Sequence, residues 1–521
     1  MPWDRDTVWS SLGQAWDLVV VGGGITGAGL LWEASRQGFR ALLLEGGDFA
    51  SGTSSRSGKL VHGGLRYLRQ GQFRVTWRAV RDRERLLREF PGLVNPLGLL
   101  LPVYQRGPVG YPLLGLGLLL YDAMALRRTH RGLGVEALRA LAPRIREEGL
   151  RGGFVYQDAL TDDARLVLRL LGEAVAAGAS ALNYARVEGF CQTRSGRVEG
   201  VVVQDLLTGR TAEVWARVVV NATGAWADIL RGRLGHPPRL RPLRGSHLLF
   251  PAWRVPLALG VSFFHPRDGR PLYALPWEGV TLVGTTDVDH REGLEGEPRI
   301  HPEEGEYLLA AVQHLFPDLG LSQRDVLVTF SGVRPVVATG KKDPSREPRD
   351  HALWDEGLLT VTGGKLTTFW TMARAALARV RGRLGEPPRR ARTSLGKREA
   401  EGILQLEDPW HLRLLARYGP EAAAAMIRTA RPGELEAIPG TRTLWAEVRW
   451  AAEREGVVHL DDLLLRRVRL GLTLPEGGIP LLERLRPWLQ PALGWDETRW
   501  QAEVERYRGV WRSAYSPSLL G

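Results

Sequence analysis

The sequence is poor in cysteine and has no obvious metal-binding pattern. Cys191 is the only cysteine among 521 residues, so the chain can form no internal disulfide and has no Cys-x-x-Cys redox pair. The 11 histidines show no His-x-x-x-His or similar ligand spacing, and we therefore predict no metal site. The near-absence of cysteine fits a reducing compartment.

Long hydrophobic runs are also missing. No stretch reaches the roughly 18 apolar residues of a transmembrane helix. The first sixteen residues include Asp4, Arg5 and Asp6 and have no apolar core, which excludes a signal peptide. Hydrophobic residues make up 44% of the chain and charged residues 25%, as in soluble globular proteins. We expect two or three domains and a location inside the cell.

The chain is strongly basic, and few of its basic residues are lysine. The formal net charge is +12 and the isoelectric point is near 10.1. Such a surface suggests an anionic partner: a phosphorylated substrate, an anionic membrane or nucleic acid. Nucleic acid is the least favoured of these, because the basic residues are dispersed and no aromatic-basic recognition motif occurs.

What the chain does have, at its start, is a strand–turn–helix–strand pattern. Asp17–Val21 predicts a strand buried on both faces, Ile25–Gln37 a helix and Arg40–Leu44 a second strand. Glu45 ends the second strand, where a carboxylate can accept hydrogen bonds from a ribose. This order is typical of a dinucleotide-binding site.

The turn of this pattern fits G-x-G-x-x-G at Gly22, Gly24 and Gly27. The first glycine makes a tight turn, the second lets the backbone approach a pyrophosphate, and the third lets helix and strand pack closely. The N–H groups of the first helical turn, at Ile25 and Thr26, then point toward the phosphates.

Three later segments combine glycine with polar groups. Thr53–Tyr67 contains hydroxyls, His62 and Arg66, and by composition alone it is as compatible with a solvated loop as with a site. Ser331–Pro335 places an arginine on a rigid turn. Gly363–Thr368 ends a strand and opens a helix, which directs N–H dipoles at a negatively charged ligand. Its lysine, Lys365, is one of only five in the chain, and this favours a specific role.

Helical and strand patterns alternate through about residue 384, and a proline-rich linker precedes a helical tail. The further elements that we predict are a helix at Asp162–Ala176, strands at Arg217–Gly224, Leu282–Asp287 and Leu358–Thr362, and tail helices at Ala446–Glu455 and Leu460–Leu470. We predict three units: an oxidoreductase region at 1–385, a linker at 386–398 and a helical domain at 399–521. Within the first unit, the cofactor-binding parts are at about 1–75, 155–240 and 330–385, and the substrate or membrane parts are at about 76–154 and 241–329.

Two short apolar stretches, Leu97–Leu101 and Leu113–Leu120, are flanked by Arg106, Arg127 and Arg128. Neither can span a bilayer. They are compatible with an interfacial helix, whose apolar face enters lipid while the arginines meet headgroups, or with a buried core helix. We favour the membrane interpretation and expect attachment through residues 97 to 121.

Together these motifs make the chain resemble the FAD-dependent glycerol-3-phosphate dehydrogenases of bacteria and mitochondria over nearly its full length. His62–Tyr67, in combination with Ser331–Pro335 and the Gly-Gly-Lys turn, is the most specific part of the likeness. The segments that carry it are Val21–Gly29, Thr53–Tyr67, Asp162–Leu166, Asn221–Gly224, Gly245–His247, Gly284–Val288, Ser331–Pro335 and Gly363–Thr368.

The resemblance implies an α/β FAD-binding domain of Rossmann type, an antiparallel β-sheet substrate domain and a C-terminal all-α cap domain. It implies oxidation of sn-glycerol 3-phosphate to dihydroxyacetone phosphate by hydride transfer to FAD, with electrons passed to a membrane quinone. The protein would then be cytoplasmic and attached peripherally to an anionic membrane surface at the inner face of the cell membrane. A homodimer is possible.

The same resemblance indicates which residues form the site. The expected catalytic and substrate-binding residues are His62, Arg66, Tyr67, His247, Arg334, Arg349 and Lys365. The expected FAD-binding residues are Gly22, Gly24, Ile25, Thr26, Gly27, Glu45, Thr53, Ser54, Ser55, Lys59, Leu60, His62, Val187, Ala222, Thr223, Gly224, Gly364, Lys365, Leu366 and Thr367. His247 is equally compatible with a packed core histidine, and Arg349 with a surface charge.

Two other functions stay open on the sequence. A soluble flavin oxidase of a related hydroxyl or amine substrate would use oxygen and release peroxide. A basic nucleic-acid-binding protein with a vestigial nucleotide fold would not bind flavin.

Overall fold

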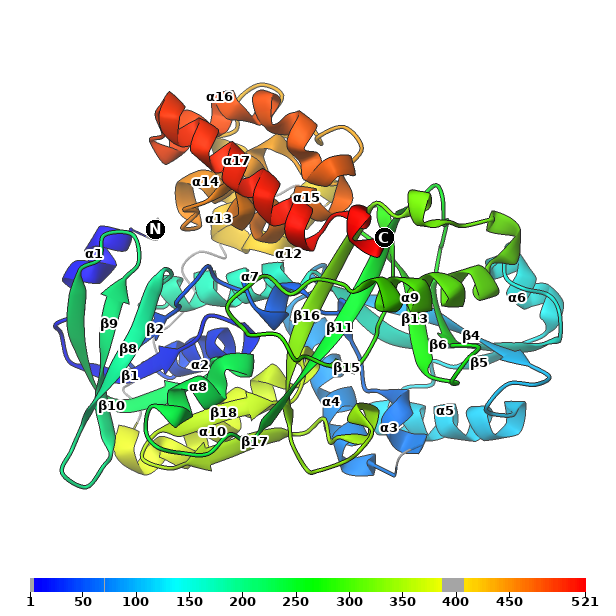
Figure 1. The fold of residues 1–521 in the computed structure, drawn as a ribbon, viewed down its shortest axis with the longest axis horizontal. Coiled ribbons are helices and arrows are strands. Elements are labelled where there is room, and N and C mark those ends of the chain that lie inside the picture. The colour runs from blue at the N-terminus through cyan, green and yellow to red at the C-terminus, as the bar shows by residue number, and fades with distance from the viewer. Residues whose placement is uncertain (1–3, 70, 387–406) are drawn as a thin grey trace.

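The computed structural model describes residues 4–69, 71–386 and 407–521. Two β-sheets lie side by side, and helices from the C-terminal part cover them along one edge (Figure 1). The predicted linker at 386–398 and the first residues of the predicted tail fall almost entirely outside the described residues.

The first sheet carries the dinucleotide pattern. Strand β1 (Trp16–Val21) pairs in parallel with β2 (Ala41–Leu44) on one side and with β10 (Thr211–Asn221) on the other. The strand order is β17-β18-β10-β1-β2-β7, and a β8–β9 hairpin extends β10. The other strands are β7 (Ser180–Leu182), β8 (Ala185–Gln192), β9 (Val198–Asp205), β17 (His351–Asp355) and β18 (Leu359–Gly363).

Three helices cover one face of this sheet. They are α2 (Ile25–Arg36), α7 (Asp163–Ala176) and α10 (Phe369–Leu384). Their apolar faces form one core with β1, β2 and β10, and the contact between α2 and α10 is close because Phe369 packs on Gly29. The predicted helices and strands of this part are confirmed to within a few residues.

The second sheet has ten strands and is almost entirely antiparallel. Its long pairs are β4–β6 and β11–β16, and among the described strands of this sheet only β12 and β4 pair in parallel. The strands are β3 (Leu60–Val61), β4 (Val94–Tyr104), β5 (Arg131–Leu133), β6 (Leu150–Thr161), β11 (Leu240–Pro251), β12 (Gly260–Phe264), β13 (Pro271–Trp277), β14 (Val280–Gly284), β15 (Val288–Asp289) and β16 (Val328–Val337). The helices beside it are α3 (Leu65–Arg69), α4 (Phe73–Glu89), α5 (Tyr111–Ala125), α6 (Val135–Leu141) and α9 (Pro302–Leu315).

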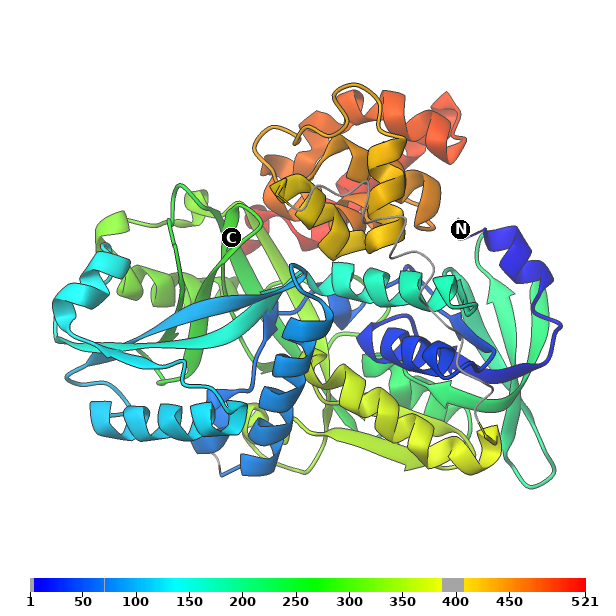
Figure 2. The same cartoon turned by 180° about the vertical axis from the view of Figure 1, so that it is seen from behind.

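One of the two apolar stretches belongs inside this sheet. Residues 97–101 lie in β4, and Leu99, Leu100 and Leu101 are almost fully buried between β12 and β6. The expectation that this stretch attaches to a membrane is therefore wrong. The other stretch forms α5, which runs along the outer edge of the molecule in both views (Figures 1 and 2).

The C-terminal part is helical, as expected. Its elements are α12 (Pro409–Tyr418), α13 (Pro420–Arg428), α14 (Trp445–Arg454), α15 (Leu470–Thr473), α16 (Leu482–Leu493) and α17 (Glu497–Ala514). The helix predicted at Leu460–Leu470 is confirmed only in part. Residues 460–467 are helical, with a π-helical stretch at Asp462–Arg467, but Arg469 takes a left-handed conformation (φ 63°) that separates them from α15. The observed sheets and the helical C-terminal part agree with the predicted fold class.

Candidate active site

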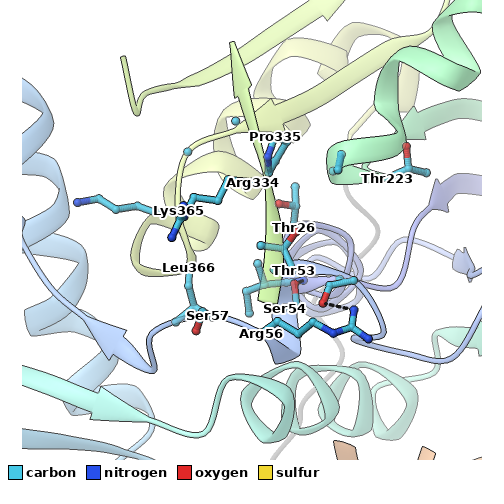
Figure 3. Close-up of a pocket in the computed structure, with 18 of the residues that line it drawn as sticks. Thr26, Thr53, Ser54, Arg56, Ser57, Thr223, Arg334, Pro335, Lys365 and Leu366 are labelled. Carbon is cyan, nitrogen blue, oxygen red and sulfur yellow. Dashed lines mark hydrogen bonds between the residues drawn. The ribbon is translucent and has the colours of Figure 1, made fainter. Parts of the chain in front are cut away.

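A cavity of about 1030 Å³ lies where the two sheets meet. Its wall on the first sheet comes from the carboxyl ends of the parallel strands β1, β2, β10 and β18, the edge at which α/β sheets bind ligands. Its other wall comes from β13, β16 and the loops beside them. Arg334, Lys365 and the loop Thr53–Ser57 surround this space, with Thr223 at its far side (Figure 3).

The glycine turn after β1 has the geometry that its sequence predicts. Gly22 has a φ of 113°, which only glycine adopts readily. A Cβ atom at Gly27 would lie 1.8 Å from the carbonyl oxygen of Gly22, so the first turn of α2 can approach the strand only without a side chain. Gly24 faces the cavity, and a pyrophosphate placed there would meet the N-terminus of α2.

Glu45 lies at the end of β2 and lines the same end of the cavity. Its carboxylate accepts hydrogen bonds from the Gly23 N–H (2.6 Å) and the Gly47 N–H (2.7 Å). Burial raises the pKa of Glu45, although these two bonds act against the shift. The carboxylate is thus held rigidly where a ribose would lie.

His62 and Lys365 meet on the opposite side of the cavity. Lys365 is the first residue after Gly363 and Gly364, both of which have positive φ, and its Nζ lies 3.4 Å from the carbonyl oxygens of His62 and Gly63. The same Nζ lies 4.5 Å from the centre of the Tyr67 ring. The backbone N–H of His62 donates to the Thr367 hydroxyl (3.1 Å). The predicted His62 and Gly-Gly-Lys motifs are therefore one structural unit.

Three arginines converge on one aspartate at the wall formed by the second sheet. Asp287 accepts from Arg349 Nη2 (2.6 Å) and Arg334 Nη1 (3.0 Å), and Arg270 Nη2 lies 3.2 Å from the same carboxylate. Arg334 also donates to the Thr285 hydroxyl (2.9 Å). Its guanidinium crosses β11 at Gly245, where a Cβ atom would lie 1.9 Å from Nη2. Three guanidiniums against one carboxylate leave an excess of positive charge, suited to a phosphate.

The structure brings most of the predicted site residues to the cavity. Besides those described above, these are Ile25, Thr26, Thr53, Ser54, Leu60, Val187, Ala222, Thr223, Gly224, Gly364, Leu366 and Thr367. Arg66 lies on α3, but its side chain is outside the described part of the structure.

Four predicted residues lie behind the cavity wall instead. Gly27 packs against the glycine turn, and Ser55 is buried in the loop behind it. Lys59 is fully buried and its Nζ bonds Asp163 (2.8 Å), so its charge is used inside the protein. His247 is buried in β11, where its ring stacks on Phe330 at 4.5 Å. Burial lowers the pKa of His247 well below its ordinary value, and nearby Arg334 lowers it further.

Sequence reasoning missed Arg270 and Asp287 as site residues. Arg270 precedes β13 in an ordinary turn, and no local motif distinguishes it from the many other arginines. Asp287 stands in the Gly284–Val288 motif, so a signal was present, but its role depends on contacts with three distant residues. Among the described residues, no group of three or more His, Cys, Asp or Glu side chains could hold a metal ion.

Comparisons with known proteins agree on one family. A family model described as FAD dependent oxidoreductase matches residues 17–379, and the model of the C-terminal domain of alpha-glycerophosphate oxidase matches residues 361–500. The aerobic glycerol-3-phosphate dehydrogenase of Bacillus subtilis (strain 168) is 38% identical over 380 residues, which cover 72% of this chain and 68% of that protein.

Solved structures give the same result over a longer part of the chain. The glycerol-3-phosphate dehydrogenase from Bacillus halodurans complexed with FAD has a TM-score of 0.77 at 30% identity, and the match covers 98% of each chain. The L-alpha-glycerophosphate oxidase from Mycoplasma pneumoniae with FAD bound has a TM-score of 0.57 at 17% identity, covering 70% of this chain and 94% of that one. This second likeness is one of fold.

Proposed function

We propose, from the fact that this chain belongs to the family of FAD-dependent glycerol-3-phosphate dehydrogenases, that it oxidises sn-glycerol 3-phosphate to dihydroxyacetone phosphate. We further propose that the electrons pass to a membrane quinone. The observation that carries the proposal is that one cavity combines a dinucleotide cradle with a cluster of arginines.

The residues present fit FAD. The glycine turn and the N-terminus of α2 suit the pyrophosphate, and Glu45 suits the ribose. Lys365 and the first turn after β18 place positive charge and N–H dipoles at the other end of the cavity. FAD, when bound, supplies the hydride acceptor for the reaction.

The arginine cluster fits the substrate phosphate. Arg334 and Arg349 are held in place by Asp287, so little rotamer freedom is lost when a phosphate binds. Each charge-assisted hydrogen bond to phosphate contributes about 1.5–3 kcal/mol. A substrate fixed by its phosphate would present its C2 hydroxyl in one orientation. His62 lines the same cavity, and it is our candidate for the base that takes the proton of that hydroxyl.

The purified protein's absorption spectrum tests the proposal. We expect a flavin band that bleaches when glycerol 3-phosphate is added without oxygen, and that returns when a soluble quinone is added. A protein without a flavin band would contradict the cofactor assignment. Rapid oxygen uptake with peroxide release in the absence of quinone would favour an oxidase instead.

Glu45→Ala should weaken FAD binding while the fold persists. The substitution removes the carboxylate that lines the ribose end of the cavity and that fixes the Gly23 and Gly47 N–H groups. Loss of the hydrogen bonds that the carboxylate would accept from the ribose predicts a roughly 10-fold or greater rise in the FAD dissociation constant, measured by fluorescence titration of the apoprotein. FAD should be released intact on denaturation, because we expect no covalent link; flavin that stays attached to the chain would contradict this.

Helix α5 supports attachment to a membrane surface. Leu113, Leu116 and Leu119 are 64%, 64% and 56% exposed on one side of it, and Leu118 is buried against the sheet. Phe73 and Trp77, half-exposed, lie in the first half of α4, a helix that contacts α5. Arg127 and Arg128 come two and three residues after the end of α5. An apolar helix face flanked by arginines is suited to the interface of an anionic bilayer. No described helix is long and apolar enough to cross one.

Replacing Leu116 and Leu119 together with Glu should release the protein from anionic vesicles while activity with a soluble dye acceptor is retained. Transfer of these two leucine side chains from water into the bilayer would contribute about 3–6 kcal/mol to membrane binding. Glutamates at the same positions would abolish this contribution. The matched control is the replacement of Leu206 and Leu207 with Glu. It adds the same charge at two exposed leucines in the turn between β9 and β10. Equal vesicle binding by the Leu116/Leu119 variant and the Leu206/Leu207 variant would show that α5 does not bind the membrane. Unfolding of the α5 variant would show that these leucines serve the fold instead.

A further inference from the structure

The C-terminal helical part makes direct polar contacts with the loop that forms the floor of the cavity. This loop, residues 46–58, connects Glu45 to β3 and supplies Gly46, Gly47, Ser51, Gly52, Thr53, Ser54, Arg56, Ser57 and Gly58 to the cavity wall. Its regular structure is a single 3-10 turn, Thr53–Ser55. Its conformation must therefore be stabilised from outside.

The first contact is at Asp48, three residues after Glu45. Its carboxylate accepts from Arg467 Nη2 (2.7 Å) and also bonds Arg467 Nη1 and Arg466 Nε. All three side chains are at least 97% buried. Burial acts to raise the pKa of Asp48, but the two guanidiniums outweigh it and hold the pKa below its ordinary value.

The second contact is at the middle of the loop. Arg469 Nη2 donates to the Ser55 carbonyl oxygen (2.9 Å) and to Asp163 Oδ1 (2.7 Å). Lys59 Nζ donates to the same two acceptors, at 2.7 and 2.8 Å. Arg469 adopts a left-handed φ of 63°, which costs conformational energy for a residue other than glycine. The strained conformation coincides with the contact to the loop.

The third contact is at Arg56, whose side chain is 5% exposed. Its Nε and Nη2 donate to the hydroxyl of Tyr515, at 3.2 and 3.1 Å, beyond the end of α17. The loop is tied in turn to the cofactor cradle, because the Ser54 hydroxyl accepts from the Ile25 N–H at the start of α2 (2.8 Å). A continuous chain of polar contacts thus runs from the C-terminal part to the phosphate end of the cavity.

We propose that the C-terminal helical part acts as a clamp that holds loop 46–58 in its cofactor-binding conformation. Bound FAD and the docked helical part then stabilise each other, because a coupling between two binding events acts in both directions. This inference rests on the proposed binding of FAD. Buried ion pairs are less stabilising than apolar packing of similar volume, but they fix geometry and are costly to break by removing one partner.

Arg467→Met in the full chain tests the clamp. It removes the bidentate partner of Asp48, and we expect the FAD dissociation constant of the apoprotein to rise about 10-fold or more, measured by flavin fluorescence. The matched control is Arg449→Met, a buried arginine with bidentate bonds to Glu434 inside the helical part, 2.8 and 3.0 Å. Its FAD affinity should stay within about twofold of wild type. Equal affinities for both variants would overturn the clamp.

Tyr515→Phe provides a milder variant in case Arg467→Met does not fold. It removes only the hydroxyl that accepts from Arg56 and donates to Glu297. We expect a two- to fivefold rise of the FAD dissociation constant, which corresponds to about 0.5–1 kcal/mol. An unchanged dissociation constant would count against the clamp.

Amide hydrogen exchange of the wild-type chain measures the reverse direction. Addition of FAD should slow exchange in residues 462–469 by about 10-fold or more and leave α13 unchanged. No change in residues 462–469, despite saturating FAD, would overturn the clamp alone. Failure of the wild-type protein to bind FAD would instead contradict the proposed function.

Discussion

Arg334→Ala should lower kcat/KM for glycerol 3-phosphate, the proposed substrate, by about 10²-fold or more, because the loss of roughly 2.7 kcal/mol corresponds to two decades. The side chain reaches the cavity over Gly245 and is oriented by Asp287 and the Thr285 hydroxyl. Alanine would remove the Arg334 guanidinium from the proposed phosphate site and leave the Asp287 carboxylate there with one cation fewer. Steady-state kinetics with a dye acceptor measures the effect.

Two controls separate phosphate binding from other roles of Arg334. Activity toward glycerol, which has no phosphate, should change far less than activity toward glycerol 3-phosphate. Arg241→Ala is a matched variant on β11, because Arg241 pairs with Asp289 and Glu347 and does not line the cavity. It should leave kcat/KM within about threefold of wild type. Equal losses on both substrates, or flavin loss in Arg334→Ala, would contradict the phosphate assignment.

The cofactor cradle could be predicted from the sequence because its determinants are local. The buried strand, the three glycines, the helix and Glu45 all lie within 30 consecutive residues, and each constrains the backbone by itself. The Gly-Gly-Lys turn was predictable for the same reason: two glycines with positive φ can end β18 and orient Lys365.

The arginine cluster was only partly predictable, since the carboxylate that organises it, Asp287, meets the arginines only in the folded protein. Arg334 and Arg349 were expected from motifs, but Arg270 and Asp287 approach them from the segments before β13 and between β14 and β15. No spacing in the sequence encodes which arginines share one carboxylate. The contacts of the clamp could not be predicted for a related reason. The apolar pattern at Leu460–Leu470 predicts a helix, but it does not show that Arg469 adopts a left-handed conformation and bonds Ser55 and Asp163.

The two leucine-rich stretches show the same limit. Residues 97–101 and 113–120 have similar composition, and short apolar runs are compatible with either a helix or a buried strand. Pairing of β4 with β6 and β12 places the first stretch inside the larger sheet. The second lacks a strand partner among the described residues and forms α5, with leucines exposed on one side.

His62→Asn should lower kcat by about 10²–10⁴-fold, the usual contribution of a positioned general base. His62 lines the cavity, and its backbone is held by Thr367 and Lys365. A histidine base works in its neutral form, so the wild-type rate should fall at acidic pH, where the imidazole takes up a proton. In His62→Asn this acid limb should disappear, because the group that titrates has been removed.

His247 is the competing candidate for the base, and the structure argues against it. Its ring lies behind the cavity wall, stacked on Phe330, and its pKa is well below the ordinary value because burial and nearby Arg334 disfavour the protonated form. A group that resists protonation is poorly suited to accept the substrate's proton. His247→Asn should therefore keep the acid limb in the pH profile of kcat/KM even if packing losses reduce the rate. If the limb survives in His62→Asn and vanishes in His247→Asn, the proton passes to His247, and the His62 imidazole is not the base.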